Sequence, residues 1–324
     1  MPNRVDLDKA AYIIRDKYTK EASLNITIAN GWDIYAGSQV NSIDMAKPIL
    51  SGHGSGIFSL PVDSSRRSYF RLVSGTRDTI LAEKLLPMEG AFNFRDLGGL
   101  RLKDGRKVQW GKLFRADELT KLTDSDIHYL GSIPITSVID FRAESEIKRA
   151  PDRLPQSAQF TYPITITPGA LRTEGIQTNR EEGSFSNQMK QMNRLYVSDP
   201  ACIRAYRIMF TIIQNGLSAP VVLHCSAGKD RTGMGTALIL FALGATEETV
   251  IEDYMLSKAN IADKYKDLVE KYPRTQPIFT VKKSYLAAGI EQIKSDYGSI
   301  NNFLTSVLKV DIPRIRRLYL EPRR

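Results

Sequence analysis

Residues 221–233 read Val-Val-Leu-His-Cys-Ser-Ala-Gly-Lys-Asp-Arg-Thr-Gly, and a helix-like stretch follows them. The apolar run at the start of this segment predicts a buried strand. A loop between a buried strand and the start of a helix can turn its backbone N–H groups inward, and the helix N-terminus adds partial positive charge. The sequence therefore predicts a cradle for phosphate at the carboxyl end of a strand.

Five residues separate a cysteine from an arginine in this loop. The guanidinium of Arg231 offers a planar fork that matches two phosphate oxygens. The same dipoles stabilise the thiolate of Cys225, which is the form that attacks. His224 is expected to brace the loop, and Thr232 is placed to donate a hydrogen bond to the thiolate. The residues expected to bind the phosphate are Ser226, Ala227, Gly228, Lys229, Asp230 and Arg231.

Other interpretations of the loop fit less well. An ATP-type phosphate loop needs glycine five positions before its Gly-Lys pair and Ser or Thr after it, but Leu223 and Asp230 stand there. A zinc site would need ligands clustered around His224 and Cys225, and the chain has only two cysteines and three scattered histidines. An inert buried cysteine would leave the Arg-Thr-Gly exit unexplained. We expect no metal and no cofactor.

Hydrolysis of a phosphate monoester through this loop would proceed by a phosphocysteine intermediate. The leaving oxygen then needs a proton, and two aspartates are candidates for its donor. Asp140 ends the apolar run 135–139, where a loop would leave the carboxyl edge of the sheet. The alternative role of Asp140 is a salt bridge with Arg142 or a helix cap. Asp230 lies inside the loop itself, so both candidates stay open.

The amino-acid composition limits the classes of protein to which the chain can belong. The 324 residues are 42% hydrophobic and 25% charged, as in an ordinary globular protein. The formal net charge of +9 suits an anionic substrate but equally suits plain solubility. We find no recognition-helix motif or arginine-rich tract and expect no nucleic-acid partner. No run approaches the roughly 18 apolar residues of a membrane helix, so we expect no integral membrane segment.

The amino terminus does not decide the compartment. Residues 1–20 are charged and lack an apolar core followed by a small-residue cleavage site, so no secretory signal peptide is expected in this chain. A cytoplasmic location, or a secreted or periplasmic one for a trimmed chain, stays open.

The first part of the chain predicts a small module. Residues 1–22 form an expected extension, with a helix over 8–18. Alternating segments at 24–28, 57–60, 69–73 and 79–82, separated by turn clusters, predict strands of an antiparallel sandwich-like module over residues 23–87. This module offers a surface for a partner of unknown kind.

The rest of the chain, residues 88–324, alternates strands with helices and then becomes almost wholly helical. Strands are expected at 135–141, 160–166 and 220–223, and helices at 144–149, 199–215 and from 232 onward. Such alternation predicts an α/β fold with a central sheet flanked by helices. The polar interval 167–197 fits either a lid over the site or a surface insertion with one helix near 187–196.

Several separate segments resemble one known family. Residues 224–233 look like the signature of the cysteine-dependent tyrosine phosphatases, and the Ala-Gly-Lys-Asp-Arg-Thr-Gly portion is especially similar to the atypical bacterial tyrosine/phosphoinositide phosphatases. The segments 92–99, 111–119, 139–146 and 297–304 also match that family. Phe141 stands where leucine is commoner, and the standard Trp-Pro-Asp acid loop is missing. The resemblance spans about residues 88–322 and does not cover the amino-terminal module.

The resemblance implies a phosphatase-type fold, with Cys225 as nucleophile and Arg231 as phosphate clamp. It implies a protein tyrosine phosphatase, whose substrate is a phosphorylated protein. Lys229 and Asp230 would shape substrate choice, because a lysine inside the loop suits the extra phosphates of inositol lipids. A phosphoinositide phosphatase, with dual specificity, is therefore one alternative. A phosphate-binding module without turnover and a rhodanese-like sulfur carrier are the others.

Overall fold

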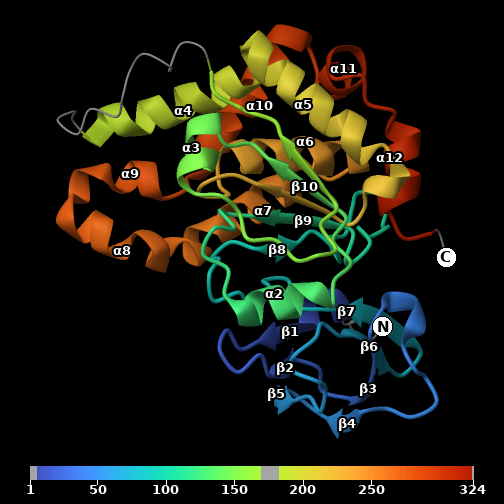
Figure 1. The fold of residues 1–324 in the computed structure, drawn as a ribbon. Helices are drawn as coiled ribbons and strands as arrows, with labels where there is room; N and C mark the ends of the chain where they lie inside the picture. The colour runs from blue at the N-terminus through green and yellow to red at the C-terminus, as the bar shows by residue number, and fades with distance from the viewer. Residues whose placement is uncertain (1–5, 169–181, 323–324) are drawn as a thin grey trace.

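A five-stranded sheet forms the centre of the computed structural model, which describes residues 6–168 and 182–322 (Figure 1). Its strand order is β11-β10-β12-β9-β8, and every neighbouring pair is parallel except β8 with β9. The strands are β8 Arg95–Asp96, β9 Leu113–Ala116, β10 Ser137–Asp140, β11 Phe160–Pro163 and β12 Val221–His224.

Alternate residues of these strands enter two separate hydrophobic cores. Val221 and Leu223 of β12 pack into one core with helices α5, α6, α10 and α12, whereas Val222 packs into the other core near helix α2. A strand buried on both faces needs a continuous apolar run, which explains the sequence of β12. The helices are α2 Asp124–Gly131, α3 Glu144–Arg149, α5 Pro200–Ile213, α6 Arg231–Leu243, α7 Glu247–Asn260, α10 Lys283–Tyr297, α11 Ile300–Asn302 and α12 Ile312–Tyr319. The fold is the predicted α/β class with a central sheet between helices.

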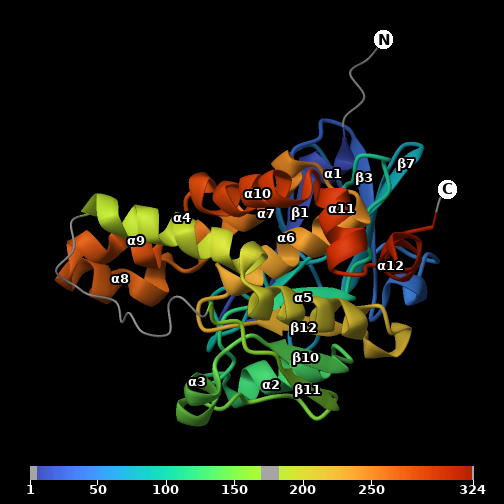
Figure 2. The same cartoon turned by 90° about the horizontal axis from the view of Figure 1, so that it is seen from above.

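Three further helices form a lateral arm that extends to one side of the sheet in both views (Figures 1 and 2). They are α4 Glu182–Ser198, α8 Ala262–Lys271 and α9 Gln276–Phe279. The helix predicted near 187–196 is confirmed as part of α4. The greater part of the loop predicted before it, residues 169–181, lies outside the described residues. In the ranges that the structure describes, no helix is both long and apolar enough to cross a membrane.

The amino-terminal part folds into two antiparallel sheets around one shared core, here called the β region (residues 7–81). Their strand orders are β1-β2-β5 and β4-β3-β6-β7. The elements are α1 Leu7–Ala10, β1 Ala11–Arg15, β2 Ala22–Ile26, β3 Gly31–Gly37, β4 Leu50–His53, β5 Gly56–Ser59, β6 Tyr69–Ser74 and β7 Arg77–Leu81.

The predicted helix over residues 8–18 is wrong. Only Leu7–Ala10 is helical, and residues 11–15 form strand β1 with strictly alternating burial. Strand β1 pairs with β2 in antiparallel register, across the boundary that we expected between residues 22 and 23. The division of the chain into units at 22/23 and 87/88 stays a prediction.

A buried ion cluster joins the β region to the central sheet. Arg67 is 1% exposed, and its guanidinium lies 3.1 Å from Glu83 and 2.8 Å from Asp96 of strand β8. The hydroxyl of Tyr129 in α2 donates to the same Glu83 carboxylate. A second contact is made by Lys20, whose ammonium lies 3.1 Å from the buried Asp126 of α2. Buried ion pairs thus hold the β region against the rest of the protein.

Candidate active site

The predicted phosphate cradle is the loop that joins β12 to α6, here called the phosphate loop (residues 225–231). It starts at the carboxyl end of β12, and His224 is level with Ala116 of β9 and Asp140 of β10. The carboxyl edge of such a sheet is where open α/β folds bind ligands. Cys225 opens the loop and is 2% exposed. The sequence therefore placed the loop correctly between strand and helix.

Side chains from other elements hold the carbonyl groups of the loop from outside. The Ser226 carbonyl accepts from the ammonium of Lys264 in α8 at 2.9 Å. The Gly228 carbonyl accepts from the guanidinium of Arg115 at 2.7 Å and from the amide of Asn93 at 3.2 Å. The Asn93 amide lies 3.5 Å from the Ala227 carbonyl as well. Three successive carbonyls are thus directed away from the centre of the loop.

The outward carbonyls leave the backbone amides of residues 226–230 without partners among the described residues. Within the ranges 6–168 and 182–322, no oxygen accepts a hydrogen bond from the amides of residues 226–230. Gly228 has a φ of +65°, which permits the turn that this arrangement requires. A row of free N–H groups above a helix N-terminus is a binding site for an oxyanion.

A carboxylate fixes the side chain of Arg231. Its guanidinium donates to both oxygens of Glu146 in α3, at 2.8 and 3.1 Å, and to the hydroxyl of Ser226 at 3.1 Å. The Ser226 hydroxyl donates in turn to Glu146. Burial alone would raise the pKa of Glu146, but the bonds from Arg231 lower it to about 2. The same contacts, with Cys225, keep the pKa of Arg231 above its ordinary value in spite of burial.

Asp140 lies below the loop in a buried charge cluster. Its carboxylate accepts from the Arg142 backbone amide at 2.9 Å and from the Arg142 guanidinium at 2.8 Å. The guanidinium also lies 2.9 Å from Asp152, and the His224 ring lies 3.1 Å from the same Asp152. The salt bridge with Arg142, which the sequence left open for Asp140, is therefore present, whereas the bracing role expected of His224 stays a prediction.

The cluster below the loop has the donor types of a metal site. Ligand atoms of Asp140, Asp152 and His224 lie within 4.8 Å of one another. However, the guanidinium of Arg142 already pairs with both carboxylates. The pKa of Asp152 is lowered by His224 and Arg142 although burial opposes this shift. Both carboxylates of the cluster are thus engaged by protein groups.

Two neighbouring loop residues form an ion pair. The ammonium of Lys229 lies 2.7 Å from one carboxylate oxygen of Asp230, and the Lys229 side chain is 4% exposed. The other carboxylate oxygen of Asp230 is buried and has no hydrogen-bond partner among the described residues. Asp230 therefore has one buried carboxylate oxygen without a partner among the described residues, whereas the Lys229 ammonium is held in the ion pair.

The hydroxyl of Thr232 is also buried and has no partner in the described part of the chain. The hydrogen bond that we predicted from Thr232 to the Cys225 thiolate is therefore not formed in this structure.

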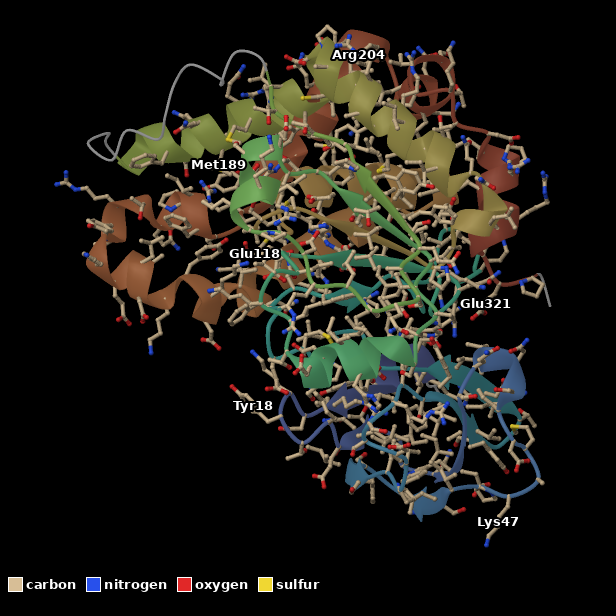
Figure 3. All side chains as sticks on the ribbon, in the orientation of Figure 1. Tyr18, Lys47, Glu118, Met189, Arg204 and Glu321 are labelled. Carbon is tan, nitrogen blue, oxygen red and sulfur yellow. The ribbon has the colours of Figure 1, made fainter. Side chains whose placement is uncertain are left out.

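Helix α8 of the lateral arm contacts the site through one lysine. The ammonium of Lys264 lies 2.7 Å from Asp117 and 3.2 Å from Glu118, in addition to the Ser226 carbonyl. Figure 3 labels Glu118, which lies between the sheet and the arm. Burial opposes the charge of Lys264, but the two carboxylates raise its pKa above the ordinary value. The arm and the phosphate loop are thus linked by a charge-assisted hydrogen bond.

Sequence reasoning named the residues inside the loop but missed those that hold it. Asn93, Arg115 and Glu146 lie in segments that we quoted for the family resemblance, yet no role followed from their positions. Lys264 carried no signal, because a lysine in an amphipathic helix is usually solvated.

The chain was compared with known proteins. Residues 86–321 match the model of a family described as the tyrosine phosphatase family. A protein of Cupriavidus necator whose name assigns it to the tyrosine-protein phosphatases is 27% identical over 237 residues, which is 70% of this chain and 85% of that protein. The triple specificity protein phosphatase PtpB of Mycobacterium tuberculosis is 26% identical over 283 residues, covering 74% of this chain and all of PtpB. A tyrosine-protein phosphatase of Nostoc commune is 26% identical over 207 residues, covering 60% of this chain and 68% of that protein.

Proposed function

Because the chain belongs to the tyrosine phosphatase family, we propose that its phosphate loop hydrolyses phosphotyrosine with Cys225 as the nucleophile. The observation that carries this proposal is that protein groups hold both the loop carbonyls and the Arg231 side chain in place. Carbonyls are held outward while Glu146 holds the Arg231 guanidinium beside the free amides. Protein groups alone hold this arrangement, so little reorganisation is needed when charge develops on the phosphoryl oxygens.

The proposed reaction has two displacements. The Cys225 sulfur forms a bond to phosphorus while the bond from phosphorus to the tyrosine oxygen breaks, and the leaving oxygen takes a proton from an acid. Water then attacks phosphorus, the sulfur leaves as thiolate, and the acid regains a proton from the water. The loop amides and Arg231 hold the three equatorial oxygens through both steps.

We assign the proton transfer to Asp230 rather than to Asp140. Asp230 lies within the loop and has one carboxylate oxygen that no group in the described ranges contacts by a hydrogen bond. The Asp140 carboxylate accepts hydrogen bonds from the backbone amide and the guanidinium of Arg142, and the Asp140 side chain is only 2% exposed. Asp140 is thus proposed as a positioning residue that supports the base of the loop.

The nucleophile is tested with an aryl phosphate. Cys225→Ser should lose turnover while it still binds the substrate, because the clamp and the amides are intact. Cys202→Ala is the matched control, since Cys202 is the only other cysteine and lies buried in α5. Turnover in Cys225→Ser at the wild-type rate would refute the assignment of the nucleophile.

A second candidate substrate is a phosphoinositide. Support for it comes from Lys229 in the loop and from a relative that is named for triple specificity. Against it stands the ion pair of Lys229 with Asp230, which keeps the ammonium from a further phosphate. The ratio of kcat/KM for a phosphotyrosine peptide to that for a soluble inositol phosphate decides between them. A ratio well above one favours the phosphotyrosine substrate, and a ratio below one favours the inositol phosphate.

A further inference from the structure

A second cavity lies where the β region meets the central sheet. Its volume is about 620 Å³, which is within the usual range of small-molecule sites. Lys112 and Pro220, which precede β9 and β12, line it. Because the phosphate loop leaves the opposite ends of these strands, the cavity and the candidate active site are on opposite edges of the sheet. Residues of the β region, among them Val40, Tyr69 and Arg71, line the other side.

Two aromatic walls of this cavity are fixed in place. The indole N–H of Trp110 donates to the Ile80 carbonyl at 3.1 Å, and the indole ring packs directly on Gly98 and Gly99. A methyl group on either glycine would come within 2.7 Å of Trp110. A ring held in this way can receive a flat ligand with little loss of conformational entropy.

Tyr69 forms the second wall and is held from both sides. The Arg67 guanidinium lies over its ring at 4.9 Å from the centroid. Its hydroxyl lies against Gly111, where φ is +73° and an added methyl group would clash at 2.3 Å. The shape of the wall therefore depends on a glycine at this position.

One cation of the cavity has no anionic partner among the described residues. Arg71 and Lys112 line it together with the carboxylate of Glu321, which Figure 3 labels near the carboxyl end of the chain. Arg71 faces Asp78 at 3.6 Å. Lys112 is half-buried and enters no ion pair or side-chain hydrogen bond within the described ranges. Its ammonium is therefore the group that an anion in the cavity could pair with.

We propose that this cavity is a second ligand site, separate from the phosphate loop, for a planar aromatic molecule that carries one anionic group. The ring lies between Trp110 and Tyr69, and the anion pairs with Lys112. The ligand contacts both the β region and the central sheet, so it binds only where the two are joined.

The test uses the two tryptophans of the chain. Trp32 is 3% exposed within the β region core, and Trp32→Phe leaves Trp110 as the single fluorescent indole. The probe is anilinonaphthalene sulfonate, an aromatic anion that accepts energy from tryptophan. We expect saturable energy transfer from Trp110, unchanged by inorganic phosphate at concentrations that occupy the active site. The neutral analogue N-phenylnaphthylamine should bind at least about tenfold more weakly, because a charge-assisted hydrogen bond is lost.

Three variants complete the test. Lys112→Met should weaken binding of the sulfonate about tenfold without affecting the neutral analogue. Val40→Asp, at a side chain that is 37% exposed, should weaken it independently of the lysine. Lys47→Met, an exposed lysine of the β region away from the cavity, should bind like the parent. The proposal is overturned if phosphate displaces the probe, or if either Lys112→Met or Val40→Asp binds it like the parent.

Discussion

Glu146 is the residue on which the orientation of the proposed phosphate clamp depends. Glu146→Gln keeps the side-chain shape but removes the charge that pairs with both guanidinium nitrogens of Arg231. We expect kcat for an aryl phosphate to fall about tenfold to a hundredfold, which corresponds to about 1.4–2.7 kcal/mol. Glu144→Gln is the matched control, because Glu144 lies on the same helix with its side chain 80% exposed. A wild-type kcat in Glu146→Gln would show that Arg231 needs no partner.

The acid limb of the rate profile gives a second measurement on Glu146. Its pKa is lowered from 4.5 to about 2 in the folded protein. A carboxyl group whose pKa is lowered by folding stabilises the folded state at pH values above its ordinary pKa. This contribution to stability is lost as the pH falls through about 2. Above pH 4.5 the Arg231–Glu146 pair therefore stays ionised. Glu146→Gln should lower the plateau of kcat. Any acid limb of the pH–rate profile that lies above pH 4.5 should keep its position.

The proton donor is tested by two matched substitutions. Asp230→Asn should flatten the basic limb of the pH–rate profile and slow substrates with poor leaving groups most, because these need the proton. Asp140→Asn should lower the melting temperature and the rate while it keeps the shape of the profile, since it weakens the bonds to Arg142. The reverse pattern would make Asp140 the acid.

At the residue scale, the sequence predicted site residues that are neighbours in the chain and missed those that are far apart in it. Cys225 and Arg231 were found because a strand, a loop and a helix follow one another directly. The partner of Arg231 is 85 positions away in the sequence, and the guanidinium that holds Gly228 is 113 positions away. Only the pairing of β12 with β9 and β10 brings these groups together, and one sequence does not encode that pairing in any local pattern.

At the element scale, the phosphate loop depends on one glycine. In Gly228→Ala, the new methyl group would lie 2.4 Å from the Ala116 carbonyl oxygen at a φ of +65°. Gly105→Ala is a matched control, with a φ of +83° and no neighbour within 4 Å. Both should lose about 1–2 kcal/mol of unfolding free energy for the left-handed backbone. Only Gly228→Ala should lose about 1–3 kcal/mol more of its unfolding free energy, because of the clash. It should also lose most of its activity, because the clash shifts the loop amides. Equal losses in denaturant unfolding would contradict the clash.

Strand β1 shows why a local pattern can mislead at this scale. Residues 10, 13 and 14 are apolar, and this spacing also fits one face of a helix. In the structure Tyr12 and Ile14 are 51% and 45% exposed, while Ala11 and Ile13 are buried. The backbone hydrogen bonds of β2 decide between the two periods. Strands β3 and β4 were not predicted at all, although β6 and β7 were; β4 is only Leu50–His53 and carries Ser51 and Gly52 in place of an apolar alternation.

At the scale of the whole molecule, Arg67 joins the two parts. Arg67→Met would leave Glu83 and Asp96 buried without their common cation. We expect a loss of about 3–5 kcal/mol in unfolding free energy, typical of removing one partner from a buried ion pair. The neighbouring Arg66 is exposed, so Arg66→Met should stay within about 0.5 kcal/mol of the parent. A wild-type melting temperature in Arg67→Met would mean that the β region is only tethered.

The same arginine links a change in one part to the stability of the other. A deletion that removed residues 1–85 would take Arg67 and Glu83 together, and it would leave Asp96 with the amides of Gly98 and Gly111 as its partners among the described residues. A change of Asp96 to a neutral residue would instead leave the buried Arg67 paired with Glu83 alone in the described part of the chain. Either change removes a buried ion pair, so we expect each to lower the free energy of unfolding.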